Sequence, residues 1–288
     1  MRAWTGIVLL ALVQGLSGCG DSGPSSIPSA ASAVSPAGSA APAQTKGAVS
    51  SIWGFVMDTG FRRIAGATVE VVDGPHAGLS TTTDDAGEFT LAGPFDPTTR
   101  FRASREGHVA ATQGLDCSAS SNASSCGGAA TRSWLGFYLE VLAPPVDVAG
   151  VYSLTFIADP ACPDLPNEVR TRTYKATITP DSKQGVPANT GYTATVSGAT
   201  FVDGLDHFVI GVAGDHVAFW LFGGHNPALV EQVAPSTYVA FSGTAAASMS
   251  PSDVTVSTSF DGWIEYYGAA VTRTRCETAA HRIVLTRR

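Results

Sequence analysis

Charged residues, and basic residues above all, are scarce in this sequence. Charged residues of both signs make up 14% of the 288 residues, against about 25% in ordinary soluble domains. The formal net charge is −7, so the chain lacks the basic surface with which proteins bind nucleic-acid phosphates. We therefore exclude DNA and RNA as partners.

Long hydrophobic runs and the common catalytic and metal-binding motifs are missing as well. The apolar run at residues 6–13 is much shorter than the roughly 20 residues that a membrane-spanning helix needs. No two cysteines have CxxC spacing, no histidine is followed three residues later by glutamate, and no Gly-x-Ser-x-Gly occurs. The sequence therefore predicts no metal, no cofactor and no enzymatic activity.

Glycine and proline, in contrast, are abundant, with 31 and 17 residues, and hydrophobic residues make up 44%. This mixture is typical of many short strands joined by turns rather than of helices. The length leaves room for two domains of ordinary size. We predict an all-β chain, with a small N-terminal β-sandwich followed by a C-terminal antiparallel β-barrel or sandwich.

The N-terminal residues have the features of an export signal. A cationic start precedes the apolar run, and Leu-Ser-Gly-Cys follows at residues 16–19. This motif resembles the bacterial lipobox, which implies that residues 1–18 are a lipoprotein signal peptide and that Cys19 is diacylated. Gly20 stands where lipoproteins retained at the inner membrane have Asp. We expect a cell-envelope protein whose lipid anchor lies in the outer membrane; the alternative is an unmodified Cys19 behind an ordinary cleaved signal.

Residues 19–50 predict a tether between this anchor and the folded part. They consist almost entirely of Ser, Ala, Pro and Gly, with Asp21 and Lys46 as the only charged residues. Such a composition has too little hydrophobic bulk to form a core, and its prolines favour a partly extended, disordered chain. The tether would therefore act as a spacer from the membrane.

Four cysteines remain after the lipobox: Cys117, Cys126, Cys162 and Cys276. An even number in an oxidising compartment predicts two disulfides, and four cysteines allow three pairings. The simplest pairing joins Cys117 to Cys126 in a local ring and Cys162 to Cys276 across a long loop. The long loop would stabilise the fold by about 4–5 kcal/mol in the chain-entropy model.

Residues 51–142 form the first predicted domain. In the run 64–73 apolar and polar side chains alternate, which is the period-2 pattern of a half-buried strand. A turn at residues 85–87, rich in the Asp and Gly that tight hairpins favour, precedes a strand that carries Phe89 and Leu91 inward. We therefore expect a hairpin here and a sheet throughout the domain.

Several short motifs of this domain agree in order and spacing with a known module. The motifs are Gly54-x-Val56-x-Asp58, Ile64-x-Gly66-Ala67-x-Val69, Thr83-Asp84-x-x-Gly87-x-Phe89 and Glu106-Gly107-His108. They resemble the carboxypeptidase regulatory-like domain. The resemblance implies a small β-sandwich of the transthyretin-like or carbohydrate-binding-like type, which is usually an accessory module without catalytic residues.

Residues 147–288 form the second predicted domain, with about nine strands. Their predicted bounds are 150–157, 171–179, 192–201, 207–212, 217–222, 237–244, 254–264, 269–275 and 281–286. Turn signals at 203–204 and 261–262 separate some of them, and a brief helix is predicted at 229–233. Sequential strands with short turns favour a meander that closes into a barrel.

The first and last strands of this domain resemble those of lipocalin-like barrels. Gly150-Val151-Tyr152 corresponds to the Gly-x-Trp that opens such barrels, with Tyr152 in place of the tryptophan. Arg282, Arg287 and Arg288 lie near the end, where the family has an arginine that packs across that residue. The resemblance implies an eight-stranded barrel, which either is filled by side chains or holds a small ligand.

The richest concentration of aromatic residues also lies in this second domain. Its members, our candidate binding residues, are Phe219, Trp220, Trp263, Tyr266 and Tyr267. Aromatic side chains on a surface or lining a barrel bind sugar rings or lipids. The alternative is that these residues simply pack in the core.

Together these observations predict a non-catalytic lipoprotein that serves as a binding or structural module at the cell envelope. In the first hypothesis the N-terminal sandwich binds a glycan or a protein, and aromatic residues exposed on one sheet face would favour it. In the second, the C-terminal barrel carries a small apolar ligand. The third hypothesis is an unrecognised hydrolase.

Overall fold

The computed structural model describes residues 49–115, 132–181, 189–223 and 226–288. Across these ranges the chain is all-β, as predicted, and its only helical element is a 3₁₀ turn, η1 (Asn167–Val169). The predicted signal peptide, Cys19, most of the predicted tether and the predicted disulfide between Cys117 and Cys126 lie outside the described residues. In the described part no helix is long and apolar enough to cross a membrane.

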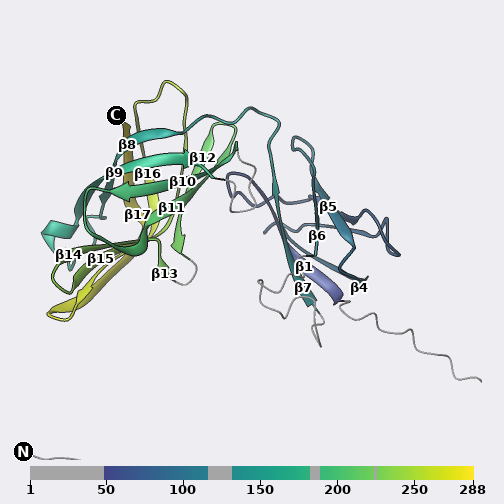
Figure 1. The fold of residues 1–288 in the computed structure, drawn as a ribbon, viewed down its shortest axis with the longest axis horizontal. Coiled ribbons are helices and arrows are strands. Elements are labelled where there is room, and N and C mark those ends of the chain that lie inside the picture. Colours follow the sequence, from purple (N-terminus) through teal and green to yellow (C-terminus); the bar gives the residue numbers. More distant parts are fainter. Residues whose placement is uncertain (1–48, 116–131, 182–188, 224–225) are drawn as a thin grey trace, which may run out of the picture. The chain divides into compact units, whose positions relative to one another are not determined.

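The first seven strands form two small sheets (Figure 1). In the first, called the β1 sheet, β1 (Val49–Asp58) lies between β4 (Glu88–Phe95) and β7 (Arg132–Leu139). It is antiparallel to β4 and parallel to β7. The second, called the β2 sheet, has the antiparallel order β3-β2-β5-β6. Its strands are β2 (Thr68–Val71), β3 (Ser80–Thr82), β5 (Arg100–Ser104) and β6 (Ala111–Gly114).

One hydrophobic core lies between the β1 and β2 sheets. Val69, Phe89 and Leu91 are buried in it, as their alternation with polar residues predicted. Phe95 of the β1 sheet meets Phe101 of the β2 sheet edge to face, with 5.2 Å between ring centroids. Burying a side chain of this size contributes about 1.5–3 kcal/mol. The burial of these inward-facing side chains therefore holds the two sheets together as a sandwich.

The turn predicted at residues 85–87 is present, but it does not close a hairpin. Gly87 has a φ of 70°, and the Oδ1 atom of Asp84 accepts the backbone N–H of Glu88 at 2.8 Å. The two strands that the turn joins, β3 and β4, belong to different sheets. The predicted hairpin is therefore wrong, because β3 pairs with β2 and β4 pairs with β1, and this arrangement buries the inner faces of both sheets in one core.

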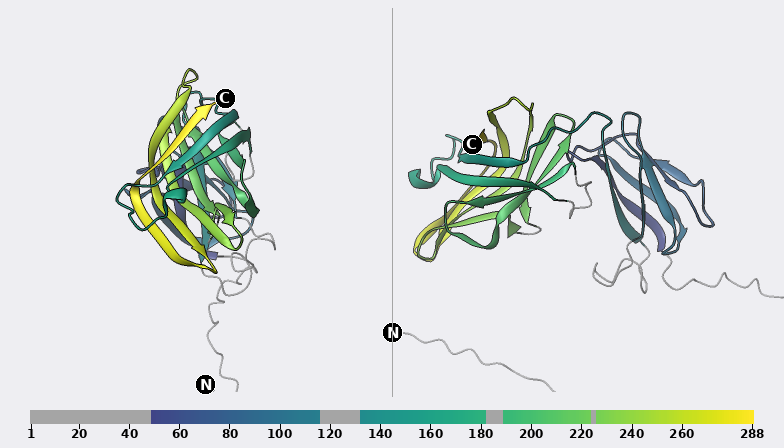
Figure 2. Two further views of the ribbon diagram at one scale, coloured as in Figure 1. Left: turned by 90° about the vertical axis from the view of Figure 1, so that its left-hand side faces the viewer. Right: turned by 45° about the horizontal axis from the view of Figure 1, so that its top comes forward.

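Ten further strands follow from residue 150 onward. Their bounds are β8 (Gly150–Ile157), β9 (Thr171–Pro180), β10 (Gly191–Ser197), β11 (Phe201–Ala213), β12 (His216–Gly223), β13 (Asn226–Pro227), β14 (Leu229–Ala234), β15 (Thr237–Ser248), β16 (Thr255–Gly268) and β17 (Val271–Arg287). Eight of them close into an antiparallel barrel in the order β8-β9-β10-β11-β12-β15-β16-β17, and β17 returns to pair with β8 (Figure 2). The predicted barrel is confirmed.

Residues 229–233, predicted as a helix, are part of strand β14, so that prediction is wrong. β12 pairs with the second half of β15, and β14 pairs with its first half, so the two short strands occupy successive parts of the same place in the barrel wall. β14 also pairs with the first half of β11. The helix prediction failed because free backbone groups of β11 and β15 flank this short apolar run, and only a strand satisfies them.

Two predicted turns fall inside long strands and are also wrong. Residues 203–204 lie within β11 and residues 261–262 within β16, while the strands predicted at 269–275 and 281–286 are both parts of β17. Gly262 is the register partner of Gly243 on β15, and a side chain at either position would overlap the opposite backbone. The glycines therefore mark a close approach and a bulge in a continuous strand rather than its end.

Large buried side chains occupy the barrel interior. Phe156 of β8 stacks on Phe241 of β15 at 4.5 Å and meets Phe260 of β16 edge to face at 5.8 Å. Arg287 lies where β17 and β8 pair and the barrel closes. Its guanidinium lies 5.4 Å from the ring centroid of Tyr152 and donates a hydrogen bond of 2.8 Å to the Tyr152 hydroxyl. An arginine of the last strand packs across residue 152, as the lipocalin-like resemblance implied.

The predicted disulfide between Cys162 and Cys276 is confirmed, with 5.9 Å between the Cα atoms. It ties the segment after β8 to the middle of β17, across 114 residues of sequence. His281 is fully buried beside it. The ring accepts the backbone N–H of Asp159 at its Nδ1 atom, at 3.0 Å, and its Nε2–H group points to the carbonyl of Cys276. Burial lowers the pKa of this histidine.

Candidate functional site

The five aromatic residues predicted as a binding site are not brought together by the structure. Phe219 and Trp220 are neighbours on β12, and side chains alternate along a strand, so they point to opposite sides of the barrel wall. Phe219 is buried in the interior, whereas Trp220 is 37% exposed on the outside. Of the five residues, only Trp220 lines the cleft described below, and Trp220 and Phe219 both line the smaller pocket next to it.

The other three aromatic residues lie on β16. Trp263 lies under the guanidinium of Arg275 at 4.4 Å, and Tyr267 stacks on Tyr238 at 5.4 Å. Tyr266 packs against the barrel core. All three side chains are half-buried, and of the three only Tyr266 packs against the core, which was the alternative interpretation of the sequence.

A different set of aromatic residues forms a continuous row, which we call the aromatic track. Each ring meets the next edge to face, with centroid distances of 5.2, 6.1, 6.3, 5.5 and 5.3 Å in order. The row runs Trp134, Phe55, Tyr138, Phe61, Trp220, Phe222. It begins on the β1 sheet and ends on β12 of the barrel.

The β1 sheet carries its share of the track on its outer face. Trp53 of β1 and Trp134 of β7 are register partners on adjacent strands, and they are 43% and 49% exposed. Phe55 and Tyr138 follow two and four residues further along these strands, on the same face. The signal for this face was present in the sequence, because β1 alternates large aromatic residues with a second apolar set that fills the core.

The turn at residues 58–62 places the next ring of the track. Asp58 is buried, and its Oδ1 atom accepts the backbone N–H groups of Gly60 and Arg62, both at 2.9 Å. Arg62 also donates from Nε to the Oδ2 atom of Asp58 at 2.6 Å. Phe61 has a φ of 62°, which is a strained conformation for a bulky residue and costs about 1–3 kcal/mol. The hydrogen bonds of Asp58 hold this strain, and they set the Phe61 ring against Trp220.

The same turn lies directly against the barrel wall. The hydroxyl of Thr59 donates to the carbonyl of Val212 on β11 at 2.6 Å. Gly211, its neighbour, has no side chain, and a Cβ atom there would overlap the carbonyl oxygen of Thr59 and the Phe61 ring. The glycine thus permits the close approach that joins the two parts of the track.

A cleft of about 750 Å³ lies along the track. Phe55, Phe61, Tyr138, Trp220 and Phe222 line it together with four polar residues, Arg63, Asp181, Thr193 and His207. The Oδ2 atom of Asp181 accepts the hydroxyl of Thr193 at 2.7 Å, and His207 lies 3.1 Å from the carboxylate of Asp206. The cleft therefore has aromatic walls with a few polar groups, the composition of most small-ligand sites.

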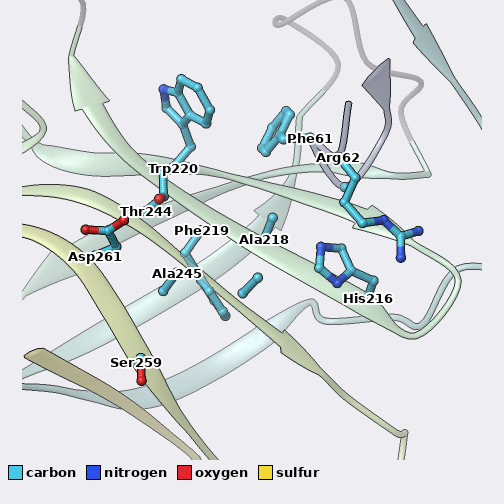
Figure 3. A pocket seen from close by; sticks show the side chains of 12 residues that line it. Phe61, Arg62, His216, Ala218, Phe219, Trp220, Thr244, Ala245, Ser259 and Asp261 are labelled. Carbon is cyan, nitrogen blue, oxygen red and sulfur yellow. The ribbon is translucent and has the colours of Figure 1, made fainter. Parts of the chain in front are cut away.

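A smaller pocket of about 350 Å³ shares Phe61 and Trp220 with the cleft (Figure 3). Arg62 and His216 lie near each other in it, and Asp261 is also part of its lining. Burial lowers the pKa of His216, and the nearby guanidinium of Arg62 lowers it further. Both effects disfavour the protonated form of His216.

Two arginines near the track, Arg63 and Arg132, stack on aromatic rings. The guanidinium of Arg63 lies 4.3 Å from the Phe55 ring centroid, and that of Arg132 lies 5.6 Å from the Trp53 ring. Among the described residues neither forms an ion pair with a carboxylate. Burial raises the pKa of the Tyr138 hydroxyl, and the positive charge of Arg63 opposes that rise. The site thus combines aromatic surface with uncompensated positive charge.

One group of three possible metal ligands occurs in the described part of the chain. It consists of Cys162, Cys276 and His281. The two sulfur atoms are bonded to each other, and both ring nitrogens of the histidine already face backbone groups. The group is therefore structural in this oxidised form.

Comparisons with known proteins give no family for this chain. No family model matches it, and no curated protein is similar to it. One solved structure to which it is similar is the Bacillus anthracis TIE protein, with a TM-score of 0.24 and 13% identity over 80% of this chain. The match covers 48% of that protein, so the chain spans about half its length. A likeness at this TM-score indicates neither fold nor function.

Proposed function

We propose that this chain is a non-catalytic carbohydrate-binding module of the bacterial cell envelope. The observation that carries the proposal is the exposed pair Trp53 and Trp134 on adjacent strands of the β1 sheet. Two such side chains, one of them the first ring of the aromatic track, form a contact surface that suits a flat, partly apolar ligand. A sugar ring has that character, since one face of it presents C–H groups and its edges present hydroxyls.

The geometry of the sheet favours this ligand. β1 and β7 pair over eight residues without a register shift, so the two indoles lie on a rigid platform. Large aromatic side chains have few rotatable bonds, and a ligand that contacts them costs little conformational entropy. Arg132, placed over the Trp53 ring, adds hydrogen-bond donors beside the platform.

The location at the envelope is supported by two features. The motif at residues 16–19 resembles a lipobox, and the disulfide between Cys162 and Cys276 is of a kind that persists in oxidising compartments. The resemblance of the first domain to the carboxypeptidase regulatory-like module also favours an accessory binding role. Lipid on Cys19, with the tether behind it, would hold the aromatic surface near the glycans of the envelope.

The experiment is a glycan microarray followed by calorimetry on the purified chain, with the variants Trp53→Ala and Trp134→Ala. Each is expected to weaken glycan binding about thirtyfold, because truncating a central aromatic contact costs about 2 kcal/mol. Leu142→Ala is the matched control, since Leu142 is 69% exposed and lies off the track. Equal affinity of all three variants would contradict the proposal. An envelope protein that binds through the tryptophans while no glycan does would establish the alternative partner.

A further inference from the structure

We propose that the cleft binds an acidic sugar and that Arg63 pairs with its carboxylate. The proposal rests on the carbohydrate-binding function above and names the chemical class of the ligand. The β1 sheet and its following turn bear two arginines, Arg63 and Arg132, that lie over aromatic rings and have no carboxylate partner in the described part of the chain. On the β2 sheet, in contrast, Arg100 pairs with Asp73 and Arg102 with Glu70.

The backbone holds Arg63 in place from both sides. It forms an isolated β-bridge with Met57, and it follows directly after the turn that Asp58 caps. Its guanidinium lies 4.3 Å from the Phe55 centroid. A guanidinium that stacks through its flat face keeps its edge N–H groups free, and these match the two oxygens of a carboxylate. Arg63 is therefore preorganised for an anion.

The surroundings of Arg63 strengthen such a pair. Phe55, Phe61 and Tyr138 line the cleft next to it, and apolar walls lower the local dielectric constant and so increase the attraction between charges. Glu88 on β4, the register partner of Phe55, lies beside the strand position on whose ring Arg63 stacks. The acidic groups on the barrel side are engaged: Asp181 accepts a hydrogen bond from Thr193, and Asp206 lies against His207. These barrel residues would form hydrogen bonds with hydroxyl groups of the sugar, while Arg63 would pair with its carboxylate.

Arg132, the second arginine without a carboxylate partner in the described part of the chain, favours a polymeric ligand. Arg132 lies over Trp53 at the other end of the β1 sheet. Trp53 and Met57 are four residues apart on β1, a distance of about 13 Å at the usual rise of a strand. A chain of acidic sugars along the track would present one carboxylate to each arginine.

The test compares fragments of polygalacturonate with the same fragments after chemical reduction of the carboxyl groups to alcohols. Binding of both probes to the full chain is measured by calorimetry, for the wild type, Arg63→Gln and Arg102→Gln. The wild type is expected to prefer the acidic probe by about tenfold for each of the two charge pairs, about a hundredfold in all, since one hydrogen-bonded charge pair has an effect of about tenfold. Arg63→Gln is expected to lower this preference about tenfold, because Arg132 remains, and to leave the affinity for the reduced probe unchanged. Arg102→Gln, the same change on the β2 sheet, is expected to behave as the wild type.

The outcomes separate this proposal from the function on which it rests. Equal affinity of the wild type for the two probes, or a preference that is as large in Arg63→Gln as in the wild type, overturns the acidic ligand while glycan binding by Trp53 and Trp134 stands. If neither probe nor any glycan on the microarray binds the wild type, both proposals fail. A loss of the preference at high salt supports the charge pair, because salt screens it.

Discussion

The two sheets of the sandwich share one core but differ in what they expose. The outer face of the β2 sheet carries arginines that pair with acids, such as Arg100 with Asp73 at 2.5 Å. The outer face of the β1 sheet carries Trp53 and Trp134, and the nearby arginines stack on rings instead. Both sheets are held by the same buried core, so the packing of the sandwich does not require this difference.

The comparison teaches that the outer face of the β1 sheet is shaped by something other than stability. A sheet that faces water needs only polar residues on its outer side, as the β2 sheet has. Exposed tryptophans add an aggregation risk and little stability. The proposed glycan ligand would account for them, and the following predictions test the distinction between the inner and outer faces.

The largest expected effect is a difference in the free energy of unfolding between substitutions on the two faces of strand β7. Phe137 is buried and Trp134 is exposed, and both lie on β7. Phe137→Ala is expected to lower the free energy of unfolding by about 3–5 kcal/mol, because it leaves a cavity in the core. Trp134→Ala is expected to change it by less than about 1 kcal/mol. Urea denaturation measures both; a Trp134→Ala variant as unstable as Phe137→Ala would show that the outer tryptophan is part of the fold.

The pH dependence of stability tests the contact between His216 and the turn that follows β1. Burial and Arg62 lower the pKa of His216 in the folded state, so it lies below the unfolded value of about 6.5. The unfolded chain then takes up a proton more readily, and stability is complete above about pH 6.5 and falls as the pH decreases below it. Urea unfolding at pH 7.5 and pH 5 is expected to show a smaller loss for His216→Gln than for the wild type. The buried His281 contributes with the same sign in both proteins, and an equal loss would contradict the assignment to His216.

The smallest effect is expected on the outer face of the β2 sheet. Arg102 and Glu70 form an ion pair whose side chains are 50% and 25% exposed. Partly exposed pairs contribute about 0.2–1 kcal/mol, so Arg102→Gln is expected to lower the free energy of unfolding by no more than this. The difference from the wild type should vanish in 1 M NaCl. A loss above 2 kcal/mol would mean that these ion pairs hold the sheet and are not a solvated surface.

The sequence predicted those features that depend on local pattern. Alternating residues such as Val69, Phe89 and Leu91 located strands and their buried faces, and the spacing of strands predicted a barrel. The pairing of Cys162 with Cys276 belonged to the simplest of the three arrangements that four cysteines allow, and it is present. The helix at residues 229–233 failed because a short apolar run fits both a helix and a strand, and only the neighbouring strands decide between them.

Most of the candidate site could not be predicted from the sequence, for a physical reason. Its rings come from positions as distant as Phe55 and Phe222, and only the folded chain brings them together. The positive φ of Phe61 gave no signal, because nothing in the residues of that turn distinguishes strain from an ordinary loop. Trp220 was identified by its aromatic neighbours, although the strand alternation then placed Phe219 on the other side of the wall.

The pairing of β8 with β17 has a consequence for the evolution and engineering of the barrel. Because Tyr152 on β8 and Arg287 on β17 are direct neighbours, the entry and exit of this domain lie about one strand spacing apart, roughly 5 Å. A short peptide would join them, and new termini would fit in the exposed hairpin at residues 269–270. The barrel is thus suited to circular permutation, and to insertion as a whole into a surface loop of an unrelated protein.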